Sequence, residues 1–312
     1  MSRVARRAHA RFGHDRAMET RMCCVAIALF SLVLAACSGV RDETPPPVAT
    51  RDVPVANGTI HVEVAGGDGD AVLLIHGGFG DRRMWDAQFP GLVPGARMVR
   101  MDLRGFGASP LPTAAYSASD DVLAVMDALG IAKAHVVGNS MGGALAIDFA
   151  LAHPERVASI VVEASGPNGF PVADDRAKYQ SDLAAITSAF QGGAATWKQQ
   201  PMVVVAHADP RVAPLLHRMI DDNARIFAMQ AWPDDDKTAV GRLAGLRVPA
   251  LFIVGDRDIA LVRDAAAYGA AHIAGARIET IRGTDHLAHM EEPAAFAALV
   301  RPFIAAHATA KH

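Results

Sequence analysis

The stretch Gly138-Asn139-Ser140-Met141-Gly142 joins a predicted strand to a predicted helix through a very short turn. Before it, residues 135–137 form an apolar run with two β-branched side chains, which favours a buried strand. After it, residues 142–153 are rich in alanine and leucine and end at Pro154, as a helix would. Two glycines remove the side chains that would clash in such a turn. We therefore expect the Ser140 hydroxyl to stand out at the carboxyl edge of a sheet.

The rest of the chain alternates apolar strands with helices, which predicts an α/β fold with a mostly parallel twisted sheet and helices on both faces. Further strands are expected at 59–64, 71–75, 97–101, 157–162, 250–254 and 276–281, and further helices at 119–129, 263–271 and 293–307. From 167 to 236 this alternation breaks into a long, mostly helical stretch, which we interpret as a cap inserted over one edge of the sheet. The core is then built from 53–166 and 237–312.

The first 36 residues have the pattern of an export signal. Six arginines precede an uncharged, largely apolar stretch at 23–36 that is too short to span a bilayer comfortably. It ends in Leu34-Ala35-Ala36-Cys37, which resembles the lipobox of bacterial lipoproteins, whose cysteine is lipidated and becomes the mature N-terminus. The resemblance implies a signal peptide over 1–36, a lipid on Cys37 and a proline-rich tether over 37–52. It also implies an exported protein anchored to the cell envelope, and Ser38 favours the periplasmic side of the outer membrane.

Composition excludes several classes of function. The chain is 51% hydrophobic and 20% charged, which is ordinary for a protein with a sizeable core. No run of lysine and arginine follows the signal, so nucleic acid is not an expected partner. All three cysteines lie within the first 37 residues, so the folded body has no disulfide.

No cofactor or metal is expected. The chain has no dinucleotide-binding or phosphate-loop motif. His289 lies three residues after His286 and close to Asp285 and Glu291, which could suggest a metal site. The chain offers no further ligand at the spacing of a metal site and no H-E-x-x-H motif. We expect His289 to be solvated or to cap a helix.

Three residues with the chemistry of a serine hydrolase each follow a predicted strand. A serine hydroxyl needs a base to take its proton, and the base needs an acid to orient it. Ser140, Asp258 and His286 occur in this chain order, and parallel strands bring such residues to one edge of the sheet. The order Ser, Asp, His is the one expected for an α/β-hydrolase triad.

The chain resembles the α/β-hydrolase superfamily over about 53–308, as a serine hydrolase with a cap. Five blocks match in order, namely Leu74-Ile75-His76-Gly77-Gly78, Asp102-Leu103-Arg104-Gly105-Phe106-Gly107, the Ser140 turn, Gly255-Asp256-Arg257-Asp258, and Asp285-His286 followed by Glu291-Glu292-Pro293. The resemblance implies that Ser140 is the nucleophile, His286 the general base and acid, and Asp258 the orienting carboxylate. Asp256 and, more distantly, Glu163 are rival acids.

The resemblance also implies an oxyanion hole. It would use the backbone N–H of Met141 and a second N–H from Gly78 or Phe79. His76 and Arg104 are expected to be structural.

These observations predict hydrolysis of a carboxylic ester of a small apolar substrate. Peracid-forming and haloperoxidase relatives, thioesterases and lactonases remain open. Carbon–carbon bond hydrolases also remain open, although they commonly carry Trp where this chain has Leu287. A ligand-binding module with little turnover is the alternative outside enzymes.

Overall fold

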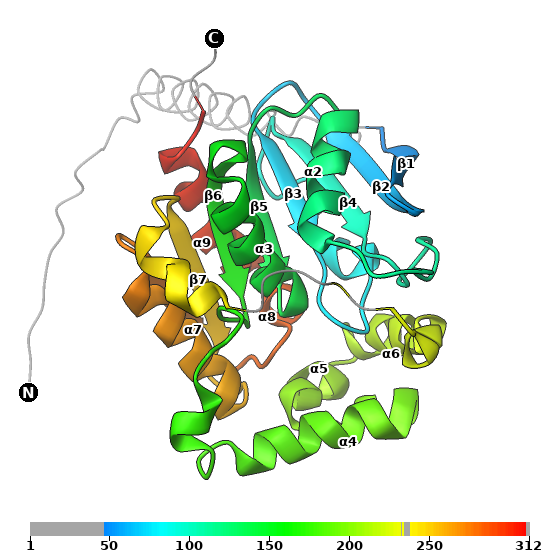
Figure 1. Ribbon diagram of the computed structural model, residues 1–312, viewed down its shortest axis with the longest axis vertical. Helices are drawn as coiled ribbons and strands as arrows, with labels where there is room; N and C mark the ends of the chain where they lie inside the picture. Colours follow the sequence, from blue (N-terminus) through cyan, green and yellow to red (C-terminus); the bar gives the residue numbers. More distant parts are fainter. Residues whose placement is uncertain (1–46, 232, 234–237, 310–312) are drawn as a thin grey trace, which may run out of the picture. The chain divides into compact units, whose positions relative to one another are not determined.

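The computed structural model describes residues 47–231, 233 and 238–309. Its eight strands are β1 (Ala49–Val55), β2 (Gly58–Gly66), β3 (Ala71–Ile75), β4 (Arg97–Asp102), β5 (Ala134–Asn139), β6 (Val157–Glu163), β7 (Ala250–Gly255) and β8 (Arg277–Ile281). They form one sheet in the order β1-β2-β4-β3-β5-β6-β7-β8 (Figure 1). Strand β2 is antiparallel to β1 and β4, whereas the other neighbours are parallel. The predicted mostly parallel sheet is confirmed.

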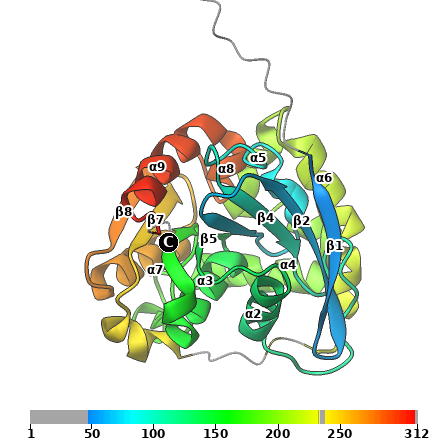
Figure 2. The ribbon, with the colours of Figure 1, turned by 90° about the horizontal axis from the view of Figure 1, so that it is seen from above.

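Helices cover both faces of this sheet (Figure 2). On one face lie α2 (Ala118–Ala128), α3 (Met141–Ala152) and α7 (Ala260–His272), and on the other lie α8 (Ala288–Glu291) and α9 (Pro293–Ala306). Short 3₁₀ helices occur at η1 (Arg82–Trp85), η2 (Pro154–Arg156) and η6 (Ala239–Gly245). Helix α2 begins after Ser117, whose Oγ accepts from Asp120 N, and is closed by Gly130 at a φ of 65°.

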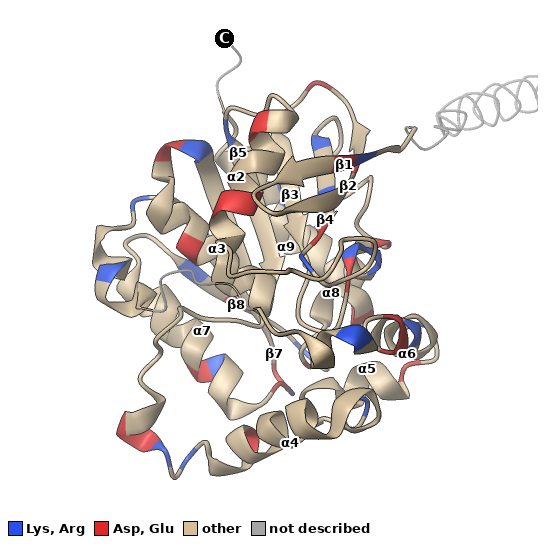
Figure 3. Ribbon diagram, turned by 45° about the vertical axis from the view of Figure 1, so that its right-hand side comes forward, with Lys and Arg blue, Asp and Glu red and all other residues tan. Residues whose placement is uncertain are grey.

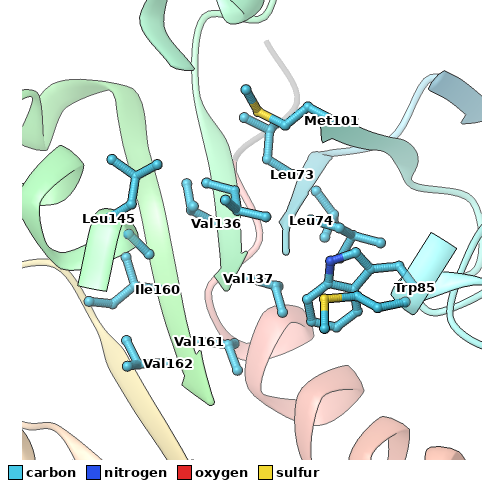
Figure 4. Close-up of a cluster of buried hydrophobic side chains, with 14 of the residues drawn as sticks. Leu73, Leu74, Trp85, Met101, Val136, Val137, Leu145, Ile160, Val161 and Val162 are labelled. Atoms are coloured by element: carbon cyan, nitrogen blue, oxygen red, sulfur yellow. The ribbon is translucent and has the colours of Figure 1, made fainter. Parts of the chain in front are cut away.

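The central strands are buried on both faces. Strands β3, β5 and β7 carry no Lys, Arg, Asp or Glu (Figure 3). Successive side chains point to opposite faces, so Val136 and Ile160 pack on the side of α3, where Leu145 meets them, and Val137 packs on the side of Trp85 (Figure 4). The rigid layer between these two cores holds the carboxyl ends of the strands in place.

The predicted helical insertion lies between β6 and β7, beneath the carboxyl ends of the central strands (Figure 1). It contains η3 (Val172–Asp175), α4 (Gln180–Trp197), η4 (Pro201–Val203), α5 (Val204–Ala208), α6 (Ala213–Asp222) and η5 (Ala224–Ala228). We call these elements the cap.

The first strand corrects the predicted start of the core. Strand β1 begins at Ala49 rather than near Val53, so residues 49–52 pair with β2 instead of belonging to the tether over 37–52. The predicted signal over 1–36 and Cys37 lie outside the described residues. Within the described part of the chain, no helix is long and apolar enough to cross a membrane.

Strand β5 and helix α3 meet at a very close contact between their backbones. A Cβ at Gly138 would overlap the carbonyl oxygen of Gly142, and a Cβ at Gly142 would overlap the carbonyl oxygens of Ile75 and His76. Backbone cannot move away as a flexible side chain could, so α3 can begin here only if both positions lack side chains. This packing fixes the position of the residue between them, Ser140.

Gly142→Ala is therefore expected to lower the free energy of unfolding by about 1–3 kcal/mol, the usual range for overpacking in a core. Gly241→Ala is the matched control, because nothing lies within 4 Å of the Cβ it would add. Chemical denaturation of both variants measures the difference. Equal stability of the two variants would contradict the tight junction.

Candidate functional site

Ser140 occupies a strained position between β5 and α3. Its backbone has φ 51° and ψ −115°, which a residue with a side chain rarely adopts. The surrounding hydrogen bonds hold it there, because Ser140 N donates to Glu163 O at 2.8 Å and Ser140 O accepts from Gly143 N at 2.9 Å. The turn presents the side chain at the edge of the sheet, as the sequence predicts.

His286 and Asp258 meet at the same edge. Asp258 follows β7 and His286 follows β8, and both are buried. His286 Nδ1 lies 2.8 Å from Asp258 Oδ2, and Asp258 Oδ1 accepts from Ile259 N at 2.8 Å. Burial by itself would lower the pKa of His286, but the negative charge of Asp258 and the hydrogen bond to it outweigh burial, so the pKa lies above its ordinary value.

The two rival carboxylates have other partners. Asp256 Oδ1 accepts from Gly283 N at 2.7 Å, so it ties two loops together. Glu163 Oε1 accepts from His289 N at 2.7 Å. Of these three acids, Asp258 is the one that is hydrogen-bonded to the His286 ring.

Ser140 and His286 line one cavity of about 390 Å³ between the sheet edge and the cap. Among the described residues, no hydrogen bond joins the Ser140 hydroxyl to His286. Catalytic hydrogen bonds are often long before substrate binds. The two side chains open onto the same space, which is the arrangement that proton transfer between them needs.

The predicted oxyanion-hole residues Gly78, Phe79 and Met141 line the same cavity. Phe79 has a φ of 62°, so the loop after β3 is sharply turned beside Ser140. Its ring packs against two rings of the cap, with centroids 3.8 Å from Trp197 and 5.1 Å from Phe227. The cap thereby helps to hold the loop that lines the cavity beside Ser140.

The rest of the cavity wall is mostly apolar, with Asn139, Ser165 and Asn168 as its uncharged polar residues. The described residues that line it include no Lys, Arg, Asp or Glu, and His286 is the one ionisable side chain among them. The apolar side chains come from both core and cap and include Met84, Met141, Ile186, Phe190, Trp197, Met202, Leu216 and Leu261. Such a wall favours an uncharged ligand with a hydrocarbon part.

A buried polar cluster that the sequence did not predict holds the backbone of His286. Asn139 Nδ2 donates to His286 O at 2.9 Å and to Glu163 Oε2 at 3.3 Å. His289 Nδ1 lies 2.7 Å from Glu163 Oε2, and both side chains are fully buried. The expectation that His289 is solvated or caps a helix is therefore wrong, because the Trp85 ring packs against its ring, with centroids 4.3 Å apart and the planes tilted by 33°, and Glu163 pairs with it.

The expected structural roles of His76 and Arg104 are confirmed. His76 Nε2 accepts from Leu103 N at 2.9 Å and its Nδ1 lies 2.7 Å from Gly77 O, which joins two loops. Burial lowers the pKa of His76, so its ring is neutral. Arg104 forms a buried pair of hydrogen bonds with Asp121, at 2.7 and 2.6 Å.

No metal site is evident in the described ranges. Within them, no group of three or more His, Cys, Asp or Glu side chains could hold a metal ion. His289, Asp285 and Glu291 are instead engaged with carboxylates and backbone groups.

Curated relatives of this chain include hydrolases of several kinds. It is 29% identical over 245 residues, 75% of this chain, to the pimeloyl-[acyl-carrier protein] methyl ester esterase of Neisseria meningitidis, of which 93% is covered. It is 36% identical over 130 residues, 39% of this chain, to the 2-hydroxy-6-oxononadienedioate/2-hydroxy-6-oxononatrienedioate hydrolase of Comamonas testosteroni. The match covers 44% of that protein.

Solved structures share the fold. A hydrolase from Pseudomonas aeruginosa superimposes with a TM-score of 0.64 at 27% identity, over 82% of this chain and 98% of that one. The carboxylesterase CesB of Bacillus subtilis superimposes with a TM-score of 0.66 at 21% identity, over 84% of this chain and 93% of that one. At this identity the likeness shows a common fold and nothing about activity. The model of the alpha/beta hydrolase family matches residues 72–299. This match, together with the sheet and the strand-to-helix turn, shows that the chain belongs to the alpha/beta hydrolase family.

Proposed function

We propose that this protein is a serine hydrolase that cleaves a carboxylic ester of a small apolar substrate, with Ser140, His286 and Asp258 as its catalytic triad. The observation that carries the proposal is the 2.8 Å contact between His286 Nδ1 and Asp258 Oδ2 beside a serine on a strained turn. The carboxylate keeps the ring proton on Nδ1. The other nitrogen, Nε2, is then free of a proton and can accept the one from Ser140.

The reaction follows from these positions. Ser140 Oγ attacks the ester carbonyl while His286 takes its proton, and the carbonyl oxygen becomes an oxyanion. The N–H of Met141 and one from Gly78 or Phe79 would stabilise that charge, and one such donor typically contributes about 3 kcal/mol. His286 then protonates the departing alcohol. Water, activated by His286, releases the acid from Ser140.

The apolar cavity supports an uncharged ester. A carboxylate on the substrate would be buried among the described lining residues without a cation to pair with it, which is costly. The related methyl ester esterase acts on an ester, whereas the related Comamonas enzyme acts on compounds with two carboxylate groups, as its name states. The cavity of this chain fits the first chemistry better. Carbon–carbon bond hydrolysis, which needs the same triad, is the second candidate because of that relative.

We also propose that Cys37 carries a lipid that anchors the exported protein to the cell envelope. The proposal rests on the Leu34-Ala35-Ala36-Cys37 pattern after an apolar stretch. Substrates would then be hydrolysed near a membrane.

Asp258→Asn should lower kcat by about 10⁴-fold with p-nitrophenyl esters, because an amide cannot hold the imidazole in the required tautomer. Asp256→Asn is the matched control and should stay within about threefold of wild type, since Asp256 bonds a backbone N–H away from the His286 ring. The larger loss in the Asp256 variant would mean that the acid is wrongly assigned.

Paired esters of equal length test the substrate class. We expect kcat/KM for p-nitrophenyl hexanoate to exceed that for the monoester of p-nitrophenol with adipic acid by about tenfold or more, because the second carboxylate would be buried unpaired. Ser140→Ala should abolish turnover of both. A preference for the charged ester would instead support the class of the Comamonas enzyme.

Cys37→Ser should remove lipid labelling and yield an unprocessed species of higher mass. Metabolic labelling with a fatty-acid analogue, followed by membrane fractionation, measures this directly. Unchanged labelling in the variant would eliminate the lipid anchor at Cys37.

A further inference from the structure

A buried carboxylate joins the cap to the loop of His286. Asp285 Oδ2 accepts from Val205 N at 2.6 Å, and Asp285 Oδ1 accepts from His286 N at 2.7 Å. Val205 belongs to α5 of the cap, and the Asp285 residue is 1% exposed. A single side chain thus holds one backbone N–H of the cap and the backbone N–H of His286.

A second hydrogen bond reinforces this link. His286 N also donates to Met202 O, at 3.1 Å, and Met202 lies in η4 of the cap. The backbone of His286 therefore contacts the cap directly. A shift of η4 and α5 would pull on His286, which lines the same cavity as Ser140.

Glu291 holds Asp285 from the other side. Its carboxylate accepts from Asp285 N at 3.0 Å and from Leu287 N at 3.3 Å. The two carboxyl groups are close neighbours in a buried place, so both are accommodated there only if one of them keeps its proton. Burial, followed by the adjacent Asp285, raises the pKa of Glu291 to about 9, so Glu291 holds this proton at neutral pH.

The neighbouring charged groups do not neutralise a second negative charge here. Arg211 donates to the backbone carbonyl of Glu291 rather than to its carboxyl, and its side chain is 66% exposed. Other titratable groups nearby have partners of their own: His286 with Asp258, His289 with Glu163, His207 with His217, and Asp209 and the exposed Glu292 with Arg211.

We propose that Asp285 is a positioning residue that fastens the cap to the His286 loop, and that Glu291, bonded to the backbone of Asp285 and Leu287, keeps it in place. The role in catalysis rests on the proposed function, whereas the fastening itself does not. When Glu291 loses its proton, two buried carboxylates face each other, Asp285 is repelled, and its bonds to Val205 N and His286 N weaken. The cap then loosens at α5 and His286 loses its support.

The sign of the pH effect follows from the raised pKa of Glu291. A group with a raised pKa in the folded state contributes stability that is fully present below its unfolded value, 4.5. That contribution is lost progressively as the pH rises toward about 9, the pKa of Glu291 in the folded state. The fastening should therefore weaken on the alkaline side, and not in acid.

Hydrogen exchange of the full chain tests this without any need for turnover. Backbone protection of α5, corrected for intrinsic exchange and compared with β5 as an internal reference, should fall by about tenfold or more in wild type as the pH passes about 9. Glu291→Gln supplies a hydrogen-bond donor that does not titrate, so its α5 protection should not change with pH, although the single acceptor oxygen of the amide lowers its overall level. Glu292→Gln, the exposed neighbour, should behave like wild type.

Asp285→Asn provides the second variant. Its amide has one acceptor oxygen in place of two, so it cannot satisfy Val205 N and His286 N equally. We expect lower α5 protection at every pH, and a lower kcat with a smaller change in KM. If Asp285→Asn does not fold, the hydrogen-exchange comparison of Glu291→Gln with wild type tests the proposal by itself.

Level α5 protection in wild type across this pH range would overturn the proposal, as would equal behaviour of Glu291→Gln and Glu292→Gln. If exchange follows the expectation while no ester is turned over, the fastening holds and the proposed function fails.

Discussion

The close approach of strand β5 to helix α3 is the constraint on which the site depends. With Gly138 and Gly142 lacking side chains, the first turn of α3 packs directly against Gly138 of β5 and against the carbonyls of Ile75 in β3 and His76 in the loop after it. Ser140 is left with φ 51°, a conformation that its backbone would avoid elsewhere. The cost of this strain is offset by the buried core on both faces of the sheet. A loop serine could not be held with comparable accuracy, because nothing would over-determine its backbone.

Buried polar side chains also hold the loop that carries His286. Glu163 ends the strand next to β5 and accepts from the backbone of His289, while Asn139 bridges Glu163 and the carbonyl of His286. These groups are sealed from water, so breaking one bond would leave a buried polar atom unsatisfied. The pairs Glu163–His289 and Asp285–Glu291 also hold the backbone on both sides of His286. The ring can therefore be oriented by Asp258 alone, without an elaborate set of side-chain contacts.

Sequence reasoning predicted the elements that have strong local patterns and the residues that follow them. The central strands are apolar runs ending in Gly or polar residues, so the order Ser140, Asp258, His286 could be derived along with the fold. Strand β1 was not predicted, and the start of the core was placed too late, because β1 is an exposed edge in which Val53 is the one buried residue, although Asn57-Gly58 marks its hairpin turn. The burial of His289 could not be derived, since its partner Glu163 lies 126 residues away. The contact from Asp285 to Val205, 80 residues apart, depends in the same way on how the cap docks.

The central claim is that Ser140 forms a covalent bond with the acyl group of its substrate. Acid quenching within the first turnover of a p-nitrophenyl ester, followed by peptide mapping with mass spectrometry, tests it most directly. The account predicts that the acyl mass appears on the peptide that contains Ser140, and that His286→Ala, which lacks the base, greatly slows its appearance. Turnover of the ester without acylation of that peptide, or with acylation of a different residue, would contradict the account.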